Sequence, residues 1–316
     1  MTGVGLDVYS SCAAIRAGID NFQETGFMDS GGEWIQGCEV PLEKPWRGTR
    51  KLAKMLAMVL SECAATQKLE LEGTPIIVCL AESDRPGRYP NLASRVFFLV
   101  QEELGIRFCD ASKVVEHGRV GGLVSIGQAQ KMVAEGSAEA VIVAAVDSLL
   151  NGSALREYEK HFRLLTSRNS DGFIPGEGAA AIAIKSVSSD QQALYCHGLG
   201  FSTEEATMDS DLPMRGTGLA EAIREAMGHA RVSIDDIDFR IVDVGGEHHW
   251  FKETALALSR LLGSKDDPPI WHISDCIGET GAVAGLASLI YLDVAFHKEF
   301  AVGSSVLHHL SNDDGK

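Results

Sequence analysis

Apolar and polar residues follow two repeating patterns along the chain. Short runs that are apolar throughout predict buried β-strands, and they fall at residues 75–81, 113–116, 140–146, 179–185, 239–244 and 301–307. Longer amphipathic runs predict helices at residues 49–65, 92–104, 121–135, 153–162, 218–230, 250–262 and 281–297. Strands that are apolar on both faces and alternate with helices predict a mainly parallel sheet covered on both sides, and hence a layered α/β fold.

A polar segment at residues 186–192 interrupts this alternation. We place a boundary near residue 190 and predict an N-terminal half of residues 1–190 and a C-terminal half of residues 191–316. Each half contains strands and helices in a similar order. The length of 316 residues suits one large domain or two ordinary ones.

Composition excludes several classes of protein. The chain is 45% hydrophobic and 23% charged, which is typical of a globular protein and not of a disordered or fibrous one. Its net charge of −16 disfavours nucleic acids and polybasic attachment to membranes. The start of the chain lacks a basic signal-peptide region, and no apolar run is long enough to span a membrane. We therefore expect a cytoplasmic protein.

Seven cysteines are present, and none belongs to a CxxC pair. Several lie inside apolar runs, as Cys79 does, which is typical of reduced thiols that pack as small core residues. No spacing of ligands predicts a zinc site or another metal site. Glycines are more informative, because they cluster at three strand-to-helix junctions, namely Gly118, Gly121 and Gly122, then Gly245 and Gly246, then Gly278, Gly281 and Gly285. Three such junctions indicate either backbone that is packed too tightly for side chains or turns that face a shared crevice.

One string at residues 171–181, DGFIPGEGAAA, resembles the DGFxxGEGA segment of β-ketoacyl synthases, the condensing enzymes of the thiolase fold. Residues 138–149 (AEAVIVAAVDSL) look like a strand of that family, and residues 123–136 look like its buried nucleophile helix. Residues 277–285 (IGETGAVAG) are similar to its GHxxGAAG segment. The order of these segments agrees from about residue 75 to residue 290. The resemblance implies a thiolase-like fold with layers α-β-α-β-α, built from two pseudo-duplicated halves.

The family's chemistry requires a cysteine at the start of the buried helix, two histidines and a lysine. Carried over residue by residue, the resemblance places Arg119 at the cysteine, Gly245 and Glu279 at the histidines, and Ser274 at the lysine. The family's C-terminal glycine-rich loop is also replaced, at residues 303–309. We therefore expect no catalytic residues in the family's positions. A buried guanidinium at residue 119 requires a partner, and we expect Glu279 first and Glu247 second.

Other residues offer a second possibility. Cys276 lies three residues before Glu279, and His248 and His249 lie three and four residues after Gly245. An activated thiolate with an oriented base near the same crevice would give an alternative nucleophile and base. Against this, Cys276 suits a small buried thiol, and the two histidines suit the polar start of a helix, capped by Glu247 or His248.

Two functions follow from these readings. The first is a non-catalytic accessory protein that acts by binding or assembly, and the second is an acyltransferase or condensing enzyme with a displaced nucleophile. We expect no cofactor. Because an apolar edge strand favours pairing, the family's mode of assembly implies that residues 138–146 pair with a twin strand, in a homodimer or with a related chain. We expect a protein partner ahead of an acyl thioester or acyl carrier protein.

The N-terminal segment adds a possible setting. Residues 31–34 (GGEW) and 41–46 (PLEKPW) are similar to short thiolase-like accessory proteins of type VI secretion effector clusters. Trp34, Trp46 and Arg47 lie in the segment of residues 14–48, and Arg50 follows it closely. We expect this segment to form a loop, either at an interface or folded over the protein's own core. Aromatic and arginine side chains are common anchors of protein interfaces.

Overall fold

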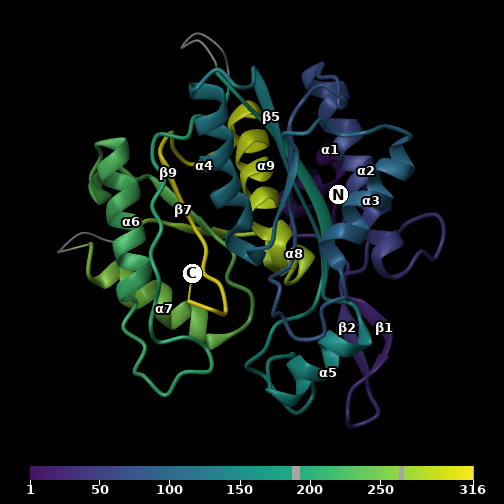
Figure 1. Cartoon of the computed structure of the whole chain (residues 1–316). Coiled ribbons are helices and arrows are strands. Elements are labelled where there is room, and N and C mark those ends of the chain that lie inside the picture. The colour runs from purple at the N-terminus through teal and green to yellow at the C-terminus, as the bar shows by residue number, and fades with distance from the viewer. Residues whose placement is uncertain (187–192, 263–266, 316) are drawn as a thin grey trace.

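The structure, a computed structural model, describes residues 1–186, 193–262 and 267–315 (Figure 1). The predicted boundary near residue 190 lies outside these described residues. The strands of these residues form a four-stranded sheet, a three-stranded sheet and a two-stranded hairpin.

The first sheet has the strand order β4-β3-β5-β6. It contains β3 (Ile76–Cys79), β4 (Lys113–Val115), β5 (Ala140–Ser148) and β6 (Glu177–Lys185). Strand β3 runs parallel to both β4 and β5, whereas β6 pairs antiparallel with β5 over its full length. All nine residues of β5 are buried, since helices cover both faces of the sheet. The predicted alternation of apolar strands and helices therefore corresponds to a mainly parallel sheet.

The second sheet has the order β8-β7-β9, and all of its pairings are parallel. It contains β7 (Phe239–Val242), β8 (Ile270–His272) and β9 (Val306–His309). The sequence predicted the last strand at residues 301–307, so the predicted start is five residues too early and the predicted end two residues too early. The carboxylate of Asp238 accepts hydrogen bonds from the backbone nitrogens of Ser304 and Ser305, at 2.7 and 2.9 Å, which holds this segment as a turn before the strand begins.

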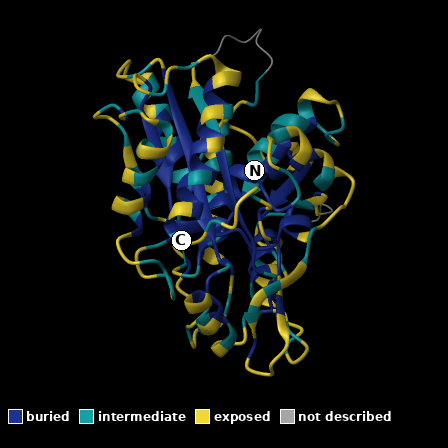
Figure 2. Ribbon diagram, turned by 90° about the vertical axis from the view of Figure 1, so that its right-hand side faces the viewer, coloured by how far each residue is buried: buried dark blue, intermediate teal, exposed yellow. Residues whose placement is uncertain are grey.

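Helices α4 (Gly121–Ala134) and α9 (Ala284–His297) lie side by side between the two sheets (Figure 1). Helices α2 (Gly48–Gln67) and α3 (Leu92–Leu104) cover the outer face of the first sheet, and α6 (Thr217–Ala230) and α7 (His248–Ser259) cover the second. One apolar cluster joins both sheets through the middle helices, and Figure 2 shows the buried strands at its centre. Because α9 is enclosed by two sheets, apolar residues lie around most of the circumference of this helix. The layers are α-β-α-β-α.

The N-terminal segment differs from the expected loop. It contains α1 (Val8–Arg16) and a hairpin of β1 (Gln23–Met28) and β2 (Trp34–Gly37), which lies beside α5 (Gly152–Lys160) in Figure 1. All six β1 residues are exposed or half-buried, so the strand lacks the apolar run that identifies a core strand. A short helix, α8 (Ser274–Ile277), precedes the middle helix α9.

The strand expected to pair with another chain was chosen wrongly. Strand β5, which contains residues 140–146, pairs with β3 on one side and with β6 on the other, so it has no free edge. The sheet instead ends at β4, where only β3 is a neighbouring strand, and at β6, where only β5 is. Periodicity cannot distinguish an internal strand from an edge strand when both are apolar.

Among the helices of the described residues, none has the length and apolarity that a membrane span requires.

Candidate functional site

The two middle helices begin in the same way. A single 3₁₀ turn, Gly118–Val120, leads into α4, and another, Gly281–Val283, leads into α9. Gly118 and Gly281 adopt positive φ angles of 50° and 57°, which glycine accepts without steric cost. The two turns contact one another, and they bring Arg119 and Glu279 to the same end of the middle layer.

Arg119 is buried among carboxylates. Its side chain is 7% exposed, and its Nη1 atom lies 3.6 Å from Glu279 Oε2 and 3.7 Å from Asp243 Oδ2. Its Nη2 atom donates a hydrogen bond of 3.0 Å to Asp313 Oδ1. The guanidinium also lies over the Trp250 ring, 4.5 Å from the centroid, in a cation–π contact. The expected contact with Glu279 is therefore present, and two further acids share the cation.

Glu247, the second expected partner, binds another arginine. Its two carboxylate oxygens accept hydrogen bonds from Arg163 Nε and Nη2, at 2.7 and 2.9 Å. Trp250 Nε1 donates to the same carboxylate at 3.0 Å, and Arg163 Nη1 reaches Asp313 at 2.5 Å. Asp313 thus joins both arginines. We call this set the Arg119 cluster, and it comprises Arg119, Arg163, Asp243, Glu247, Trp250, Glu279 and Asp313.

Burial and charge act against one another in the Arg119 cluster. Burial raises the pKa of Asp243 to about 7, although Arg119 opposes that shift. Burial likewise raises the pKa of Glu279, again against the attraction of Arg119. Burial also disfavours the charged form of Asp313, but Arg119 and Arg163 outweigh it and lower that pKa. Two arginines face four carboxylates here, so protonation of Asp243 relieves the excess negative charge near neutral pH.

The other two positions carried over from the resemblance lie together. A Cβ atom added to Gly245 would lie 3.2 Å from Cβ of Ser274. The Ser274 hydroxyl donates a hydrogen bond of 2.5 Å to the carbonyl oxygen of Val244. Gly245 follows Asp243 by two residues, so this pair adjoins the Arg119 cluster. The structure thus gathers Arg119, Gly245, Ser274 and Glu279 at one end of the middle layer.

The alternative nucleophile and bases are not brought together. Cys276 is 6% exposed, its Sγ atom lies 3.9 Å from the carbonyl oxygen of Ile15 in α1, and burial raises the pKa of its thiol. The His249 ring packs edge-on against Trp250, and burial lowers its pKa. Within the described ranges, no hydrogen bond joins the Cys276 thiol to His248 or His249.

The cap of α7 differs from expectation. Glu247 occupies the N-cap position, but its side chain makes no capping hydrogen bond because Arg163 and Trp250 engage it. The carboxylate of Asp171 instead accepts a hydrogen bond of 2.6 Å from the backbone nitrogen of His248. Asp171 belongs to the DGFIPGEGAAA string, so this motif fixes the start of a helix that follows it by 77 residues.

Sequence reasoning missed several charged groups. Arg85 binds Asp147 through two hydrogen bonds of 2.5 and 2.8 Å, and Asp147 also accepts one from the Ala282 backbone at 3.0 Å. An aspartate at the end of an apolar strand was a usable signal, because a buried acid requires a partner. Arg163 and Asp313 gave no comparable signal, because the contact that joins them spans 150 residues.

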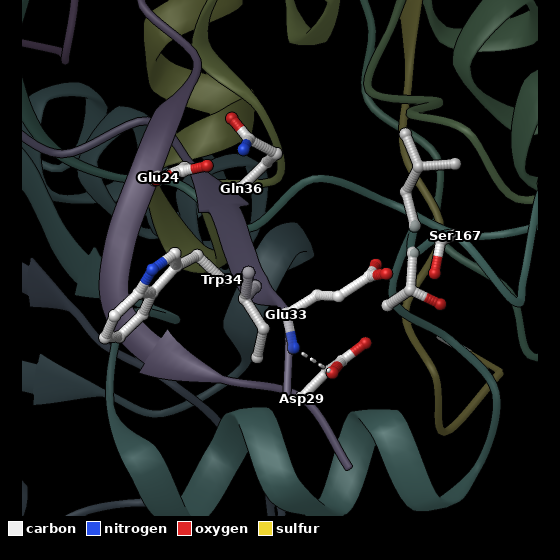
Figure 3. Close-up of a pocket in the computed structure, with 9 residues that line it drawn as sticks. Glu24, Asp29, Glu33, Trp34, Gln36 and Ser167 are labelled. Carbon is white, nitrogen blue, oxygen red and sulfur yellow. Dashed lines mark hydrogen bonds between the residues drawn. The ribbon is translucent and has the colours of Figure 1, made fainter. Parts of the chain in front are cut away.

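A shallow pocket of about 440 Å³ lies beside the hairpin. Glu24, Asp29 and Glu33 line it together with Trp34, and Figure 3 shows the Asp29 and Glu33 carboxylates on the side that faces Ser167. Asp29 accepts hydrogen bonds from the backbone nitrogens of Gly31 and Glu33, at 2.8 and 2.9 Å, so its carboxylate stabilises the hairpin turn. Across the described ranges, no group of three or more His, Cys, Asp or Glu side chains could hold a metal ion.

Comparisons with known proteins identify the fold. No protein-family model matches the chain. The ketoacyl synthase alpha subunit of the tetracenomycin polyketide synthase from Streptomyces glaucescens is 28% identical over 191 residues, which cover 55% of this chain and 45% of that protein. The actinorhodin polyketide putative beta-ketoacyl synthase 1 from Streptomyces coelicolor is 26% identical over 192 residues, 55% of this chain and 41% of that protein. The chain spans about half the length of the curated relatives it matches.

Solved structures match over nearly the whole chain. The ishigamide ketosynthase/chain length factor superposes with a TM-score of 0.76 at 17% identity, over 99% of this chain and 88% of that one. A ketosynthase in complex with its chain length factor, from Xenorhabdus doucetiae, gives a TM-score of 0.68 at 15% identity, over 95% and 83% of the two chains. The protein therefore has the thiolase-like layered fold of ketosynthases.

Proposed function

We propose that this protein is a non-catalytic, thiolase-fold binding subunit that assembles with a related ketosynthase-like chain. The observation that carries the proposal is Arg119, which occupies the start of the middle helix where the resemblance places a cysteine nucleophile. A guanidinium remains protonated in proteins and cannot serve as a nucleophile or a base. Three acids and an aromatic ring enclose it, so charge pairing fills the space in which an acyl group would react.

The alternative, an acyltransferase with a displaced nucleophile, requires a reactive thiolate near this crevice. Cys276 is buried, has a raised pKa and faces α1. Cys79 lies close to the start of α4, but it is fully buried, and burial raises its pKa to about 12. Thiols become reactive where a cation or a helix N-terminus lowers their pKa. The pKa values of Cys276 and Cys79 are both raised instead.

Pairing with a related chain is supported by the free edge of β4. The other edge strand of the first sheet, β6, already pairs with the N-terminus at Gly178 and Ala179. The backbone hydrogen-bonding groups of β4 on the side away from β3 have no strand partner within the first sheet. An edge strand of this kind offers a template for a strand from another chain. Three of the matched structures are described as ketosynthase and chain length factor together, and another as a ketosynthase complex with an acyl carrier protein. A second copy of this chain is the other candidate, and it would give a homodimer.

The likeness to accessory proteins of type VI secretion effector clusters stays a prediction, and it concerns the partner. If it holds, the chain would bind a secretion effector in place of a ketosynthase-like chain. Its test is purification of the tagged full chain from its native host, followed by mass spectrometry of the proteins that copurify. Recovery of a ketosynthase-like chain supports the proposal. Recovery of effector proteins alone would overturn it and identify an effector as the partner.

The edge contact is tested by hydrogen–deuterium exchange of the chain alone and of the purified complex. We expect new protection of backbone amides in β4, and no new protection in β8, which ends the second sheet and serves as a matched control. Unchanged exchange in β4 would remove the proposed mode of pairing. Light scattering of the chain alone distinguishes a monomer of 33.9 kDa from a homodimer.

Catalytic inactivity is tested by incubation with malonyl and long-chain acyl thioesters, followed by intact-mass measurement. We expect no covalent adduct on the wild-type protein. Arg119→Cys should also fail to condense acyl groups, because Gly245 and Glu279 stand at the histidine positions. A stable acyl adduct that disappears when a single cysteine is replaced would overturn the proposal in favour of the acyltransferase.

A further inference from the structure

A second pocket lies between the hairpin and the start of two helices, away from the Arg119 cluster. It has a volume of about 470 Å³, which is within the range of small-molecule sites. The first residues of α2 and of α5, Gly48 and Gly152, both line it. In Figure 1 the hairpin and α5 lie next to one another at one end of the molecule. No residue of the Arg119 cluster lines this pocket.

The charges of this pocket leave a positive excess. Lys51 is buried, and its Nζ atom pairs with Glu177 at 2.5 Å and with Glu39 at 2.6 Å. Both carboxylates in the lining are therefore engaged by one amine. Arg47 and Arg156 also line the pocket, are exposed, and form no salt bridge with any carboxylate of the described residues. Two guanidinium groups are thus free to meet a ligand.

Backbone donors add to this positive potential. Helix α2 is 20 residues long, and its N-cap residue Arg47 supplies no side-chain capping bond. The first amides of a helix lack partners within it and carry the positive end of the helix dipole, so they favour an anion. Helix α5 opens at the same pocket, and its residues Gly152 and Ser153 are part of the lining.

Asn151 provides the independent observation that points to a ligand. This residue lines the pocket, is 6% exposed, and caps α5 through a hydrogen bond of 2.9 Å from the Ala154 backbone nitrogen to its Oδ1 atom. That bond fixes the orientation of the amide, because only the oxygen can accept it. The Nδ2 atom is buried and has no hydrogen-bond partner. Buried donors without an acceptor are rare in folded proteins, and an oxygen atom of a ligand at this wall would supply one.

The remaining walls suit an apolar body. Phe27, Trp46 and Leu150 line the pocket, and so does Tyr89. Burial raises the pKa of Tyr89, so its hydroxyl stays protonated and can donate a hydrogen bond to an acceptor. Aromatic walls beside convergent donors are the arrangement that binds a small molecule with one charged end.

We propose that this pocket binds a small organic anion, whose carboxylate or phosphate group meets Arg47, Arg156 and the Nδ2 donor of Asn151 while its apolar part packs on Phe27 and Trp46. The proposal does not depend on the pairing with another chain. Guanidinium groups bind both kinds of oxyanion through paired hydrogen bonds, so the two share one recognition chemistry.

Binding is tested by calorimetric titration of the full chain with phenyl phosphate and with benzoate, which separate the two anions. Benzyl alcohol and benzylamine are matched neutral and cationic probes of the same apolar body. We expect a Kd of about 1 mM or tighter for one of the two anions, and a weaker interaction as salt increases. Binding of benzyl alcohol as tight as that of the anions would show an apolar pocket without anion selectivity and would overturn the proposal. The absence of heat from either anion would also overturn it.

Variants locate the site. Arg47→Gln with Arg156→Gln should weaken anion binding about tenfold or more, because charge-assisted hydrogen bonds are lost. Asn151→Asp keeps an oxygen for the cap of α5 but replaces the donor with a negative charge, so it should weaken binding without loss of the helix. Arg95→Gln, on an exposed position of α3, is the control and should leave binding unchanged. Anion binding that survives both site variants would refute the assignment.

Discussion

Replacement of Arg119 by methionine tests the charge balance of its cluster. The substitution keeps an apolar side chain of similar length but leaves Glu279 and Asp243 buried without the cation that each contacts. Removal of one partner from a buried ion pair costs about 3–5 kcal/mol, because the surviving charge is stranded. We expect a loss of that size in the free energy of unfolding near pH 8.

The loss should depend on pH in a defined direction. Without Arg119, the pKa of Glu279 rises further above its value in the unfolded chain, where the carboxyl is solvated. The folded state then binds more protons than the unfolded state, so its stability falls as pH rises through this range. One additional bound proton corresponds to about 1.4 kcal/mol per pH unit, so the loss should shrink by up to about 4 kcal/mol between pH 8 and pH 5.

The assay is urea denaturation of wild type and variant at both pH values, followed by tryptophan fluorescence and by circular dichroism. Arg95→Met, an exposed arginine on α3, is the matched control and should change stability little at either pH. Arg119→Lys should remove most of the pH dependence, because it restores the charge, while it loses the forked geometry. A loss that is equal at both pH values would indicate a packing defect and would refute the electrostatic reasoning.

Three further predictions concern single residues. The raised pKa of Asp243, about 7, lies above its unfolded value, so wild-type stability should increase by about 3 kcal/mol between pH 8 and pH 5 through this group. Asp243→Asn should lack that component in the same denaturation experiment. Gly278 has φ 70° and ψ −171°, and a Cβ atom added there would lie 2.6 Å from the Ile174 carbonyl oxygen. Gly278→Ala should therefore lower stability by about 1–3 kcal/mol. Gly73→Ala is the control and should not lower stability, because the space around Gly73 is open. In native protein treated with iodoacetamide, mass spectrometry should find exposed Cys196 labelled and buried Cys79 unlabelled; rapid labelling of Cys79 would contradict its raised pKa.

The sequence by itself determined the layered fold and the residues of the middle layer. Strands such as β5 are apolar throughout because helices cover both faces, so their positions could be predicted within a few residues. The glycines at 118 and 281 marked the two turns before the middle helices, since a positive φ angle there favours glycine. The resemblance to β-ketoacyl synthases, on local strings, then located Arg119 and Glu279, which contact one another as expected.

Only the tertiary structure decided which strand has a free edge and which charges meet. Strand order depends on how distant segments pack, so β4 and β6, and not β5, proved to be the edge strands of the first sheet. Asp313 joins Arg119 and Arg163, although 194 and 150 residues separate it from them in sequence. The cap of α7 comes from Asp171 for the same reason, and the pocket between α2 and α5 exists only because their first turns converge. Local patterns report burial and turns, whereas pairings between distant residues arise when the whole chain is packed.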